Sequence, residues 1–218
     1  MIDAPRTPLD VTVLYDPLCG WCYGATPSLR YLADQPRLAL RLLPTGLFAG
    51  PGARPIDDRF AAYAWTNDQR IHVLTGVPFS PRYRDRVLAD RRAQLDSGPA
   101  TLALTAVAQT APAHELRALE AIQAARYRDG LDVTDRSVLA TLLLHLELAP
   151  AADLLDRGAP ALDRVVAART SAARELLQSV GVHGVPTVLI ATPTGARVVP
   201  SDLLYGPTSS LASHLDLA

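Results

Sequence analysis

The 218-residue chain contains no lysine, and all 21 of its basic residues are arginines. These are balanced by 22 acidic residues, which gives a formal net charge of −1. The arginines form no basic cluster along the chain, so we interpret their use as a coding bias. Because a nucleic-acid surface requires clustered positive charge, we expect no nucleic-acid partner.

Long apolar runs are also absent. The purely apolar stretches are only a few residues long, as at Leu142–Leu144, whereas a membrane-spanning helix needs about 20 apolar residues. The N-terminus carries Asp3, Pro5 and Pro8 instead of the apolar run of a secretory signal. We therefore expect no membrane partner and a cytoplasmic location.

Cysteine is scarce, with Cys19 and Cys22 as the two examples. A structural disulfide framework uses several pairs, and a loop this short removes little entropy from the unfolded chain. A zinc site would need about two more clustered ligands, and the five histidines are widely separated. We expect no metal site and favour redox chemistry for the pair, with a structural or metal role as the alternatives.

The cysteines lie between segments that resemble a strand and a helix. Val11–Tyr15 is β-branched and apolar and predicts a buried strand, which Asp16-Pro17 then breaks. Tyr23–Ala33 is helical in pattern, and Leu38–Leu43 predicts a second strand. This close spacing indicates a βαβ unit with a parallel sheet.

The middle of the chain has a different pattern. No convincing strand occurs between about residues 56 and 168, and apolar spacing there predicts helices over 60–74, 83–95, 99–110, 113–128 and 134–148. Further on, the pattern predicts a helix over 161–180, a hairpin over 185–199 and a bent helix over 201–217. The sequence thus predicts an α/β core of residues 9–55 and 166–218, split by an all-helical insertion of residues 56–165.

The position of the cysteines suggests different roles for them. A thiol where a strand gives way to a helix lies at the helix N-terminus, where unpaired N–H groups and the helix dipole favour the thiolate. Cys22 lies one turn deeper and should be more buried, with a higher pKa. We therefore predict that Cys19 forms a mixed disulfide with the substrate and that Cys22 resolves it.

Two further elements are candidates for substrate binding. Pro186 begins a strand-like run, and with the cysteines upstream we predict a cis bond that brings the Val185 backbone beside them, free to bind an extended substrate. The alternative is an ordinary trans proline at a strand start. Between the cysteines, Gly20 and Trp21 should form part of the substrate surface, with Trp21 as a flat apolar platform or, alternatively, packed at the helix start.

The segments Asp16–Gly24 and Gly181–Thr187 together resemble the DsbA-like branch of the thioredoxin superfamily, and most closely the cytoplasmic FrnE-like proteins and predicted protein-disulfide isomerases. Asp96–Ala100 is a weaker match. The resemblance implies a thioredoxin fold with a large all-helical insertion, a redox-active Cys19–Cys22 pair and a cis Pro186. It also implies oxidation, reduction or isomerisation of protein disulfides.

The sequence departs from this family pattern at two positions. Many FrnE-like relatives carry proline where Gly20 stands, which leaves the direction of the reaction open. Many relatives place an acid six positions before the first cysteine, where this chain has Val13. Asp16 is the nearest acid and could assist proton transfer through water, or could simply be a turn residue. His183 could approach and stabilise the Cys19 thiolate, or be an exposed loop histidine.

Four aromatic residues lie in one short stretch of the predicted insertion: Phe60, Tyr63, Trp65 and Phe79. They are candidates to line a groove between the insertion and the core. The alternative is that they pack between helices.

The favoured function is that of a thiol–disulfide oxidoreductase, acting as a protein disulfide isomerase or reductase on protein or peptide thiols and disulfides. We expect no bound cofactor. Because the chain has no second cysteine pair, turnover needs an external reductant, with glutathione as a candidate redox co-substrate or a reductase as its alternative.

Two other functions stay open. One is a glutathione-dependent isomerase or transferase like 2-hydroxychromene-2-carboxylate isomerase and the kappa-class transferases, which generally use serine at the first cysteine position. The other is a non-catalytic, chaperone-like binding protein.

Overall fold

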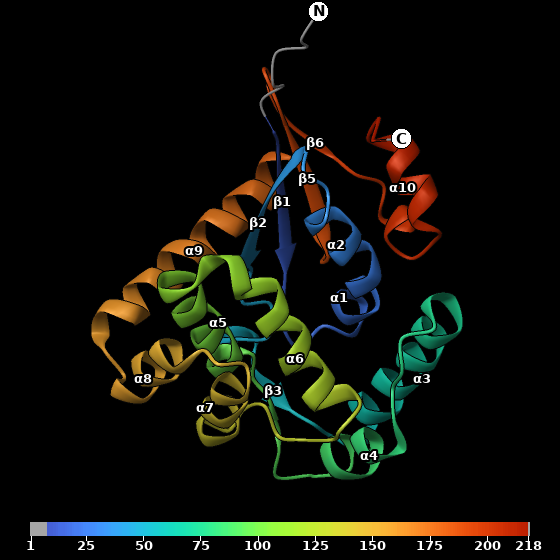
Figure 1. The fold of residues 1–218 in the computed structure, drawn as a ribbon. Helices are drawn as coiled ribbons and strands as arrows, with labels where there is room; N and C mark the ends of the chain where they lie inside the picture. Colours follow the sequence, from blue (N-terminus) through green and yellow to red (C-terminus); the bar gives the residue numbers. More distant parts are fainter. Residues whose placement is uncertain (1–7, 218) are drawn as a thin grey trace, which may run out of the picture.

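A computed structural model describes residues 8–217 of the chain. Within these residues a four-stranded sheet has the order β2–β1–β5–β6, formed by β1 (Leu9–Tyr15), β2 (Leu38–Pro44), β5 (Thr187–Thr192) and β6 (Gly195–Val198). β1 runs parallel to β2 and antiparallel to β5, and β5 and β6 form the predicted hairpin. The sheet therefore joins the two ends of the chain (Figure 1).

Apolar side chains pack on both faces of the sheet near the end of β1, where the consecutive buried residues Val13 and Leu14 point to opposite sides. Leu14 packs with Leu43 and Leu189 against α9 (Pro160–Ser179). Val13 and its alternating neighbours belong to the larger core on the opposite face. That face is covered by α1 (Gly20–Gly24), α2 (Thr26–Ala33) and α10 (Thr208–His214), as Figure 1 shows.

The predicted insertion is helical and lies beyond the end of the sheet at which β1 finishes (Figure 1). Its helices are α3 (Asp58–Thr75), α4 (Pro81–Tyr83), α5 (Gly98–Thr110), α6 (Glu115–Tyr127), α7 (Arg136–His145) and α8 (Ala149–Arg157). The division of the chain into residues 9–55 with 166–218 and residues 56–165 stays a prediction. α9 continues through its second boundary without a break.

Two segments differ from the sequence-based prediction. The predicted helix over 83–95 is a short π-helical turn at Arg84–Leu88, after which the chain bends at Ala89. The Asp90 carboxylate then accepts a hydrogen bond from the Arg92 N–H. The next residues form β4 (Gln94–Leu95), which pairs with β3 (Arg54–Pro55). The prediction of no strand between residues 56 and 168 was therefore wrong at β4.

The helix predicted over 134–148 is also shorter than expected. It ends at His145 because Glu147 adopts a left-handed conformation with φ of 62°. A second helix, α8, then begins with Pro150 in its first turn, where a missing N–H does no harm. The bend predicted near Gly206-Pro207 is confirmed, since a 3₁₀ turn and α10 lie on either side of it.

A nearly buried ion pair fastens the insertion to the sheet. Arg169 on α9 pairs with Glu115 on α6, and their side chains are 12% and 9% exposed. The Arg169 guanidinium also donates to Leu42 O on β2 at 2.8 Å and to Thr105 Oγ1 on α5 at 3.1 Å. The Tyr15 hydroxyl at the end of β1 donates to Glu115. The ion pair therefore connects two strands and three helices.

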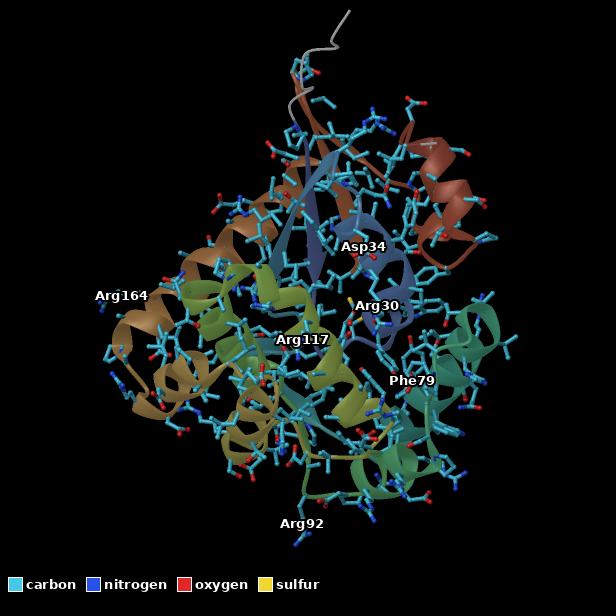
Figure 2. The ribbon with its side chains drawn as sticks, in the orientation of Figure 1. Arg30, Asp34, Phe79, Arg92, Arg117 and Arg164 are labelled. Atoms are coloured by element: carbon cyan, nitrogen blue, oxygen red, sulfur yellow. The ribbon has the colours of Figure 1, made fainter. Side chains whose placement is uncertain are left out.

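Other charged residues lie on the outer surface. Figure 2 shows Arg92 and Arg164 at the periphery of the molecule, whereas Phe79 points inward. Among the described residues, no helix combines the length and apolarity required to cross a bilayer.

We predict that Arg169→Met lowers the free energy of unfolding by about 3–5 kcal/mol, because Glu115 is left as an uncompensated buried charge. Urea denaturation followed by circular dichroism measures this loss. Arg164→Met, at an exposed position on the same helix, is the matched control. Replacing Glu115 by Gln together with Arg169→Met should restore part of the loss, and a loss no greater than that of the control would contradict the role of the pair.

Candidate functional site

The cysteine pair lies at the junction of β1 and α1. The chain leaves the sheet at Tyr15, turns through Asp16–Leu18 and places Cys19 at the N-cap of α1. Cys19 is 7% exposed and Cys22, one turn further into the helix, is 1% exposed. Both are free thiols, and Cys19 Sγ lies 3.6 Å from the carbonyl oxygen of Val185, to which it donates.

The environment of Cys22 favours its neutral form. Burial raises the pKa of the Cys22 thiol well above its usual range, and the adjacent Cys19 raises it further. This thiol is therefore protonated near neutral pH.

Asp16 is a fully buried carboxylate at the end of β1. It accepts hydrogen bonds from Leu18 N at 2.9 Å, from Phe48 N at 3.1 Å and from Ser97 Oγ at 2.7 Å. Burial raises the pKa of Asp16, and these hydrogen bonds oppose the rise. Asp16 thus connects the cysteine loop to the loop after β2 and to the insertion. The insertion donates to it through Ser97, which lies in the Asp96–Ala100 segment. Its part in proton transfer stays a prediction.

Val185 and Pro186 lie directly before β5, and their peptide bond is cis. Because Thr187 at the start of β5 pairs with Leu14 near the end of β1, this segment lies beside the cysteine loop. The strand pairing thus brings together Cys19 and Val185, which are 166 positions apart in the chain.

Beside Cys19 lies a cavity of about 260 Å³, here called the cysteine cavity. From the core it is lined by Cys19, Gly20, Trp21 and Val185; from the insertion and the loop before it, by Phe48, Phe60, Tyr63, Asp68, Tyr83, Arg126 and Tyr127. A second cavity of about 610 Å³ lies beyond Trp21 and is lined by Trp21, Val185, Pro186 and Tyr205, among others. The residues predicted to bind substrate therefore lie along two adjoining hollows.

The four aromatic residues of the insertion have three different environments. Phe60 and Tyr63 line the cysteine cavity. Phe79 is buried, with its ring 5.3 Å from that of Tyr23 and 5.1 Å from that of Tyr127 (Figure 2). Trp65 lies under the guanidinium of Arg84. The groove prediction thus holds for two of them.

Asp68 on α3 is a site residue that the sequence analysis missed. It is 4% exposed, and its Oδ2 is buried without a hydrogen-bond partner in the described part of the chain. A Cβ at Gly20 would collide with Oδ1 of Asp68, and one at Gly24 would collide with Ile71. Two glycines one turn apart thus let α3 approach α1 closely. An acid within the apolar stripe of residues 60, 64, 68 and 71 was the available signal.

Burial raises the pKa of Asp68 to about 7, while hydrogen bonding to Tyr83 and the positive charge of Arg126 oppose the rise. Arg126 is 1% exposed, with its guanidinium 5.5 Å from the ring centre of Tyr83 and 5.7 Å from that of Tyr127. The wall of the cavity beside Gly20 therefore holds an acid with a pKa near neutrality.

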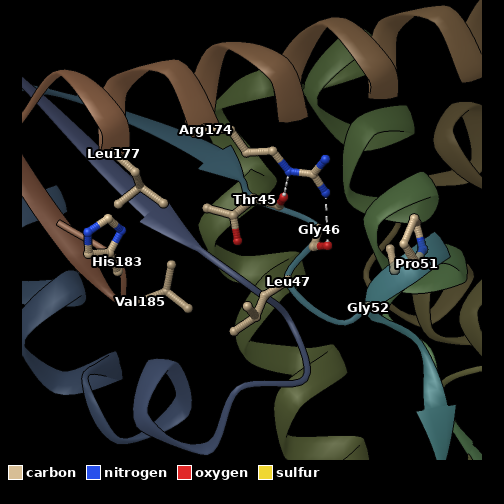
Figure 3. A pocket seen from close by; sticks show the side chains of 11 residues that line it. Thr45, Gly46, Leu47, Pro51, Gly52, Arg174, Leu177, His183 and Val185 are labelled. Atoms are coloured by element: carbon tan, nitrogen blue, oxygen red, sulfur yellow. Dashed lines mark hydrogen bonds between the residues drawn. The ribbon is translucent and has the colours of Figure 1, made fainter. Parts of the chain in front are cut away.

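His183 is exposed and lines a different hollow, of about 240 Å³. Figure 3 shows it on the wall of this hollow with Arg174, which donates to the carbonyl oxygens of Thr45 at 2.9 Å and Gly46 at 3.1 Å. The structure does not place His183 among the residues that line the cysteine cavity. Across residues 8–217, no three potential metal ligands gather into a cluster.

The fold is that of a known family. Residues 10–204 match the family model of DsbA-like thioredoxin domains, and the chain belongs to this family. None of the curated proteins matches the chain.

Several solved structures are similar over nearly the whole chain. The cytosolic disulfide reductase DsbM from Pseudomonas aeruginosa is 31% identical with a TM-score of 0.84, and the match covers 96% of this chain and 100% of DsbM. DsbM with GSH matches with a TM-score of 0.82 and 31% identity over 95% of this chain and 98% of that one. A 2-hydroxychromene-2-carboxylate isomerase shares the fold at 20% identity and a TM-score of 0.61, over 96% and 99% of the two chains.

We predict that Asp68→Asn stabilises the protein increasingly as the pH rises. The pKa of Asp68 is about 7 in the folded protein against an ordinary value of 3.8, so the folded state favours the protonated acid. The stability that protonation supplies is complete below about pH 4 and is lost as the pH rises through about 7. Each tenfold change in acid dissociation is worth about 1.4 kcal/mol, so the difference approaches roughly 4 kcal/mol.

Urea unfolding of wild type and Asp68→Asn at a series of pH values from 4 to 8 measures this difference. Asp58→Asn, at the exposed start of the same helix, controls for loss of one negative charge. A difference between Asp68→Asn and wild type that stays constant across the series would contradict the buried acid.

Proposed function

We propose that the protein is a thiol–disulfide oxidoreductase that reduces or isomerises disulfides of proteins or peptides. The observation that carries the proposal is the placement of Cys19 at the start of α1, beside Val185 and on the wall of the cysteine cavity, with buried Cys22 one turn behind it. Membership of the DsbA-like family supports an oxidoreductase.

The proposed reaction follows from this arrangement. The Cys19 thiolate attacks one sulfur of a substrate disulfide, the substrate S–S bond breaks, and one substrate thiol leaves. Cys22 then bonds to the Cys19 sulfur and releases the second substrate thiol. The raised pKa of the Cys22 thiol keeps it from competing for the first attack.

Val185 has a binding role in this proposal. An extended peptide that lies along the Val185–Pro186 segment could pair with its backbone, as a strand added to an edge does. Gly20 and Trp21 would contact the same peptide from the opposite side, since both line the cysteine cavity together with Val185.

The likeness to a cytosolic disulfide reductase, and to its structure with GSH, supports a cytoplasmic reductase or isomerase that is returned to the dithiol by glutathione. The isomerase of 2-hydroxychromene-2-carboxylate shares only the fold with this chain. Retention of both cysteines favours the disulfide chemistry over that alternative.

We predict that Cys19→Ser loses disulfide reduction altogether, because the attacking sulfur is removed and the remaining thiol, Cys22, is buried and protonated. Cys22→Ser should accumulate a covalent adduct with the substrate, since the resolving thiol is missing. Mass spectrometry after mixing with oxidised glutathione detects the adduct, which reduction by dithiothreitol must remove. Catalysis that survives Cys19→Ser would leave the glutathione-dependent isomerase or a binding protein as the better assignment.

The reduction potential of the Cys19–Cys22 pair determines the direction of the reaction. It is measured by equilibrating the protein with glutathione redox buffers and monitoring tryptophan fluorescence. A midpoint near about −270 mV indicates a reductase, near about −180 mV an isomerase and near about −120 mV an oxidase. We expect one of the first two, with the transition absent in Cys22→Ser.

A further inference from the structure

The cysteine cavity contains an acid that packing does not explain. Asp68 lies on the face of α3 where Ala64 and Ile71 also contact the cavity, and an apolar residue there would avoid the cost of burying a carboxyl group. Its Oδ2 is buried and unpartnered within residues 8–217. A buried polar atom without a partner at the wall of a reaction cavity points to a role in the reaction.

The position of Asp68 relative to Cys19 is closely defined. Its Oδ1 occupies the space that a side chain at Gly20 would fill, and Gly20 is the residue next to Cys19. Both Asp68 and Cys19 line the same cavity of about 260 Å³, which has room for the sulfur atoms of a substrate between them.

The other ionisable groups that face Asp68 cannot replace it. They are Tyr83 on α4, Arg126 and Tyr127 on α6, and Cys19 itself. Burial raises the pKa of both tyrosines, which keeps them neutral, and an arginine keeps its proton. Asp16 on the other side of the loop already accepts three hydrogen bonds. Asp68 is the group with both a free oxygen and a suitable proton affinity.

We propose, on the basis of the proposed function, that Asp68 carries the proton between Cys19 and the leaving thiol of the substrate. The Asp68 carboxylate takes the proton of the Cys19 thiol, directly or through one water. The thiolate then attacks the substrate disulfide, and the electron pair of the broken S–S bond passes to the leaving sulfur. That sulfur takes the proton from the Asp68 carboxyl group and departs as a thiol.

The second half of the reaction completes the balance. The sulfur of Cys22 bonds to that of Cys19, the Cys19–substrate bond breaks, and the proton of Cys22 ends on the second substrate sulfur. One substrate disulfide becomes two thiols while the enzyme dithiol becomes a disulfide, and no other reactant is consumed.

Leaving-group chemistry tests this role. The reduced protein is mixed with bis(2-hydroxyethyl) disulfide, whose basic aliphatic thiolate needs a proton, or with 4,4′-dithiodipyridine, whose leaving group does not. Both disulfides are uncharged. We expect Asp68→Asn to slow the aliphatic reaction about 100-fold and the pyridyl reaction by a much smaller factor. Asp58→Asn is the charge-matched control on the same helix.

The pH dependence supplies a second readout. The proposed step needs one proton shared between Cys19 and Asp68, and above about pH 7 the carboxyl group has lost this proton to solvent. The ratio of wild-type to Asp68→Asn rates with the aliphatic disulfide should therefore fall as the pH rises through about 7. Equal slowing of both disulfides, or a ratio that is constant with pH, would overturn the proposal and leave Asp68 a structural residue.

A different substitution tests the same geometry without touching the acid. Gly20→Ala should displace the Asp68 carboxyl group and reproduce the selective loss with the aliphatic disulfide. In an Asp68→Ala background, where the collision is gone, Gly20→Ala should add little further to that loss. Additive effects of the two changes would contradict the proposed contact.

The outcome for Cys19→Ser separates this inference from the proposed function. If Cys19→Ser still reduces either disulfide, the proposed function itself is wrong. If Cys19→Ser is inactive and Asp68→Asn shows no preference between the disulfides, only the proton-carrying role is wrong.

Discussion

The site depends first on the hydrogen bonds of one buried carboxylate. Asp16 ends the central strand and accepts from Leu18 N, Phe48 N and Ser97 Oγ, which belong to three separate segments. In a buried position a carboxylate is stable only when such donors are all present, so the network either forms completely or is costly. Its formation fixes where β1 stops and therefore where Cys19 begins α1. The position of the cysteine loop therefore depends on donors that other parts of the chain supply.

The insertion holds the same loop from the other side. The Tyr127 hydroxyl on α6 donates to Leu18 O at 2.7 Å, and its ring stacks on Tyr23 with 4.9 Å between the ring centres. Arg169 and Glu115 then fix α6 relative to the sheet. A helical insertion in this fold is thus part of the wall of the site, because its residues support the backbone of the cysteine loop and complete the cysteine cavity.

Local patterns predicted most of the fold, because the alternation of apolar residues in strands and their spacing in helices depend only on residues close together in the sequence. They failed where one residue changed the backbone, as at Glu147, or where a pairing was only two residues long, as in β4. The cysteines were evident from their spacing. The burial of Asp68 was not, because it depends on Tyr83, Arg126 and α1, which meet only in the folded chain. A sequence records the acid but not the close approach of the helices that encloses it.

The residue at position 20 therefore has two effects in this chain. It is one of the two residues between the cysteines, and it also decides whether the Asp68 carboxyl group can lie beside them. Any residue with a Cβ at this position would intrude on the space that Oδ1 occupies. Glycine leaves room for an acid whose pKa lies near neutrality. Burial raises this pKa, and the positive charge of Arg126 partly opposes the rise. In the proposed reaction, groups on two helices, α1 and α3, act together, so the cysteine pair cannot be understood from its own four residues alone.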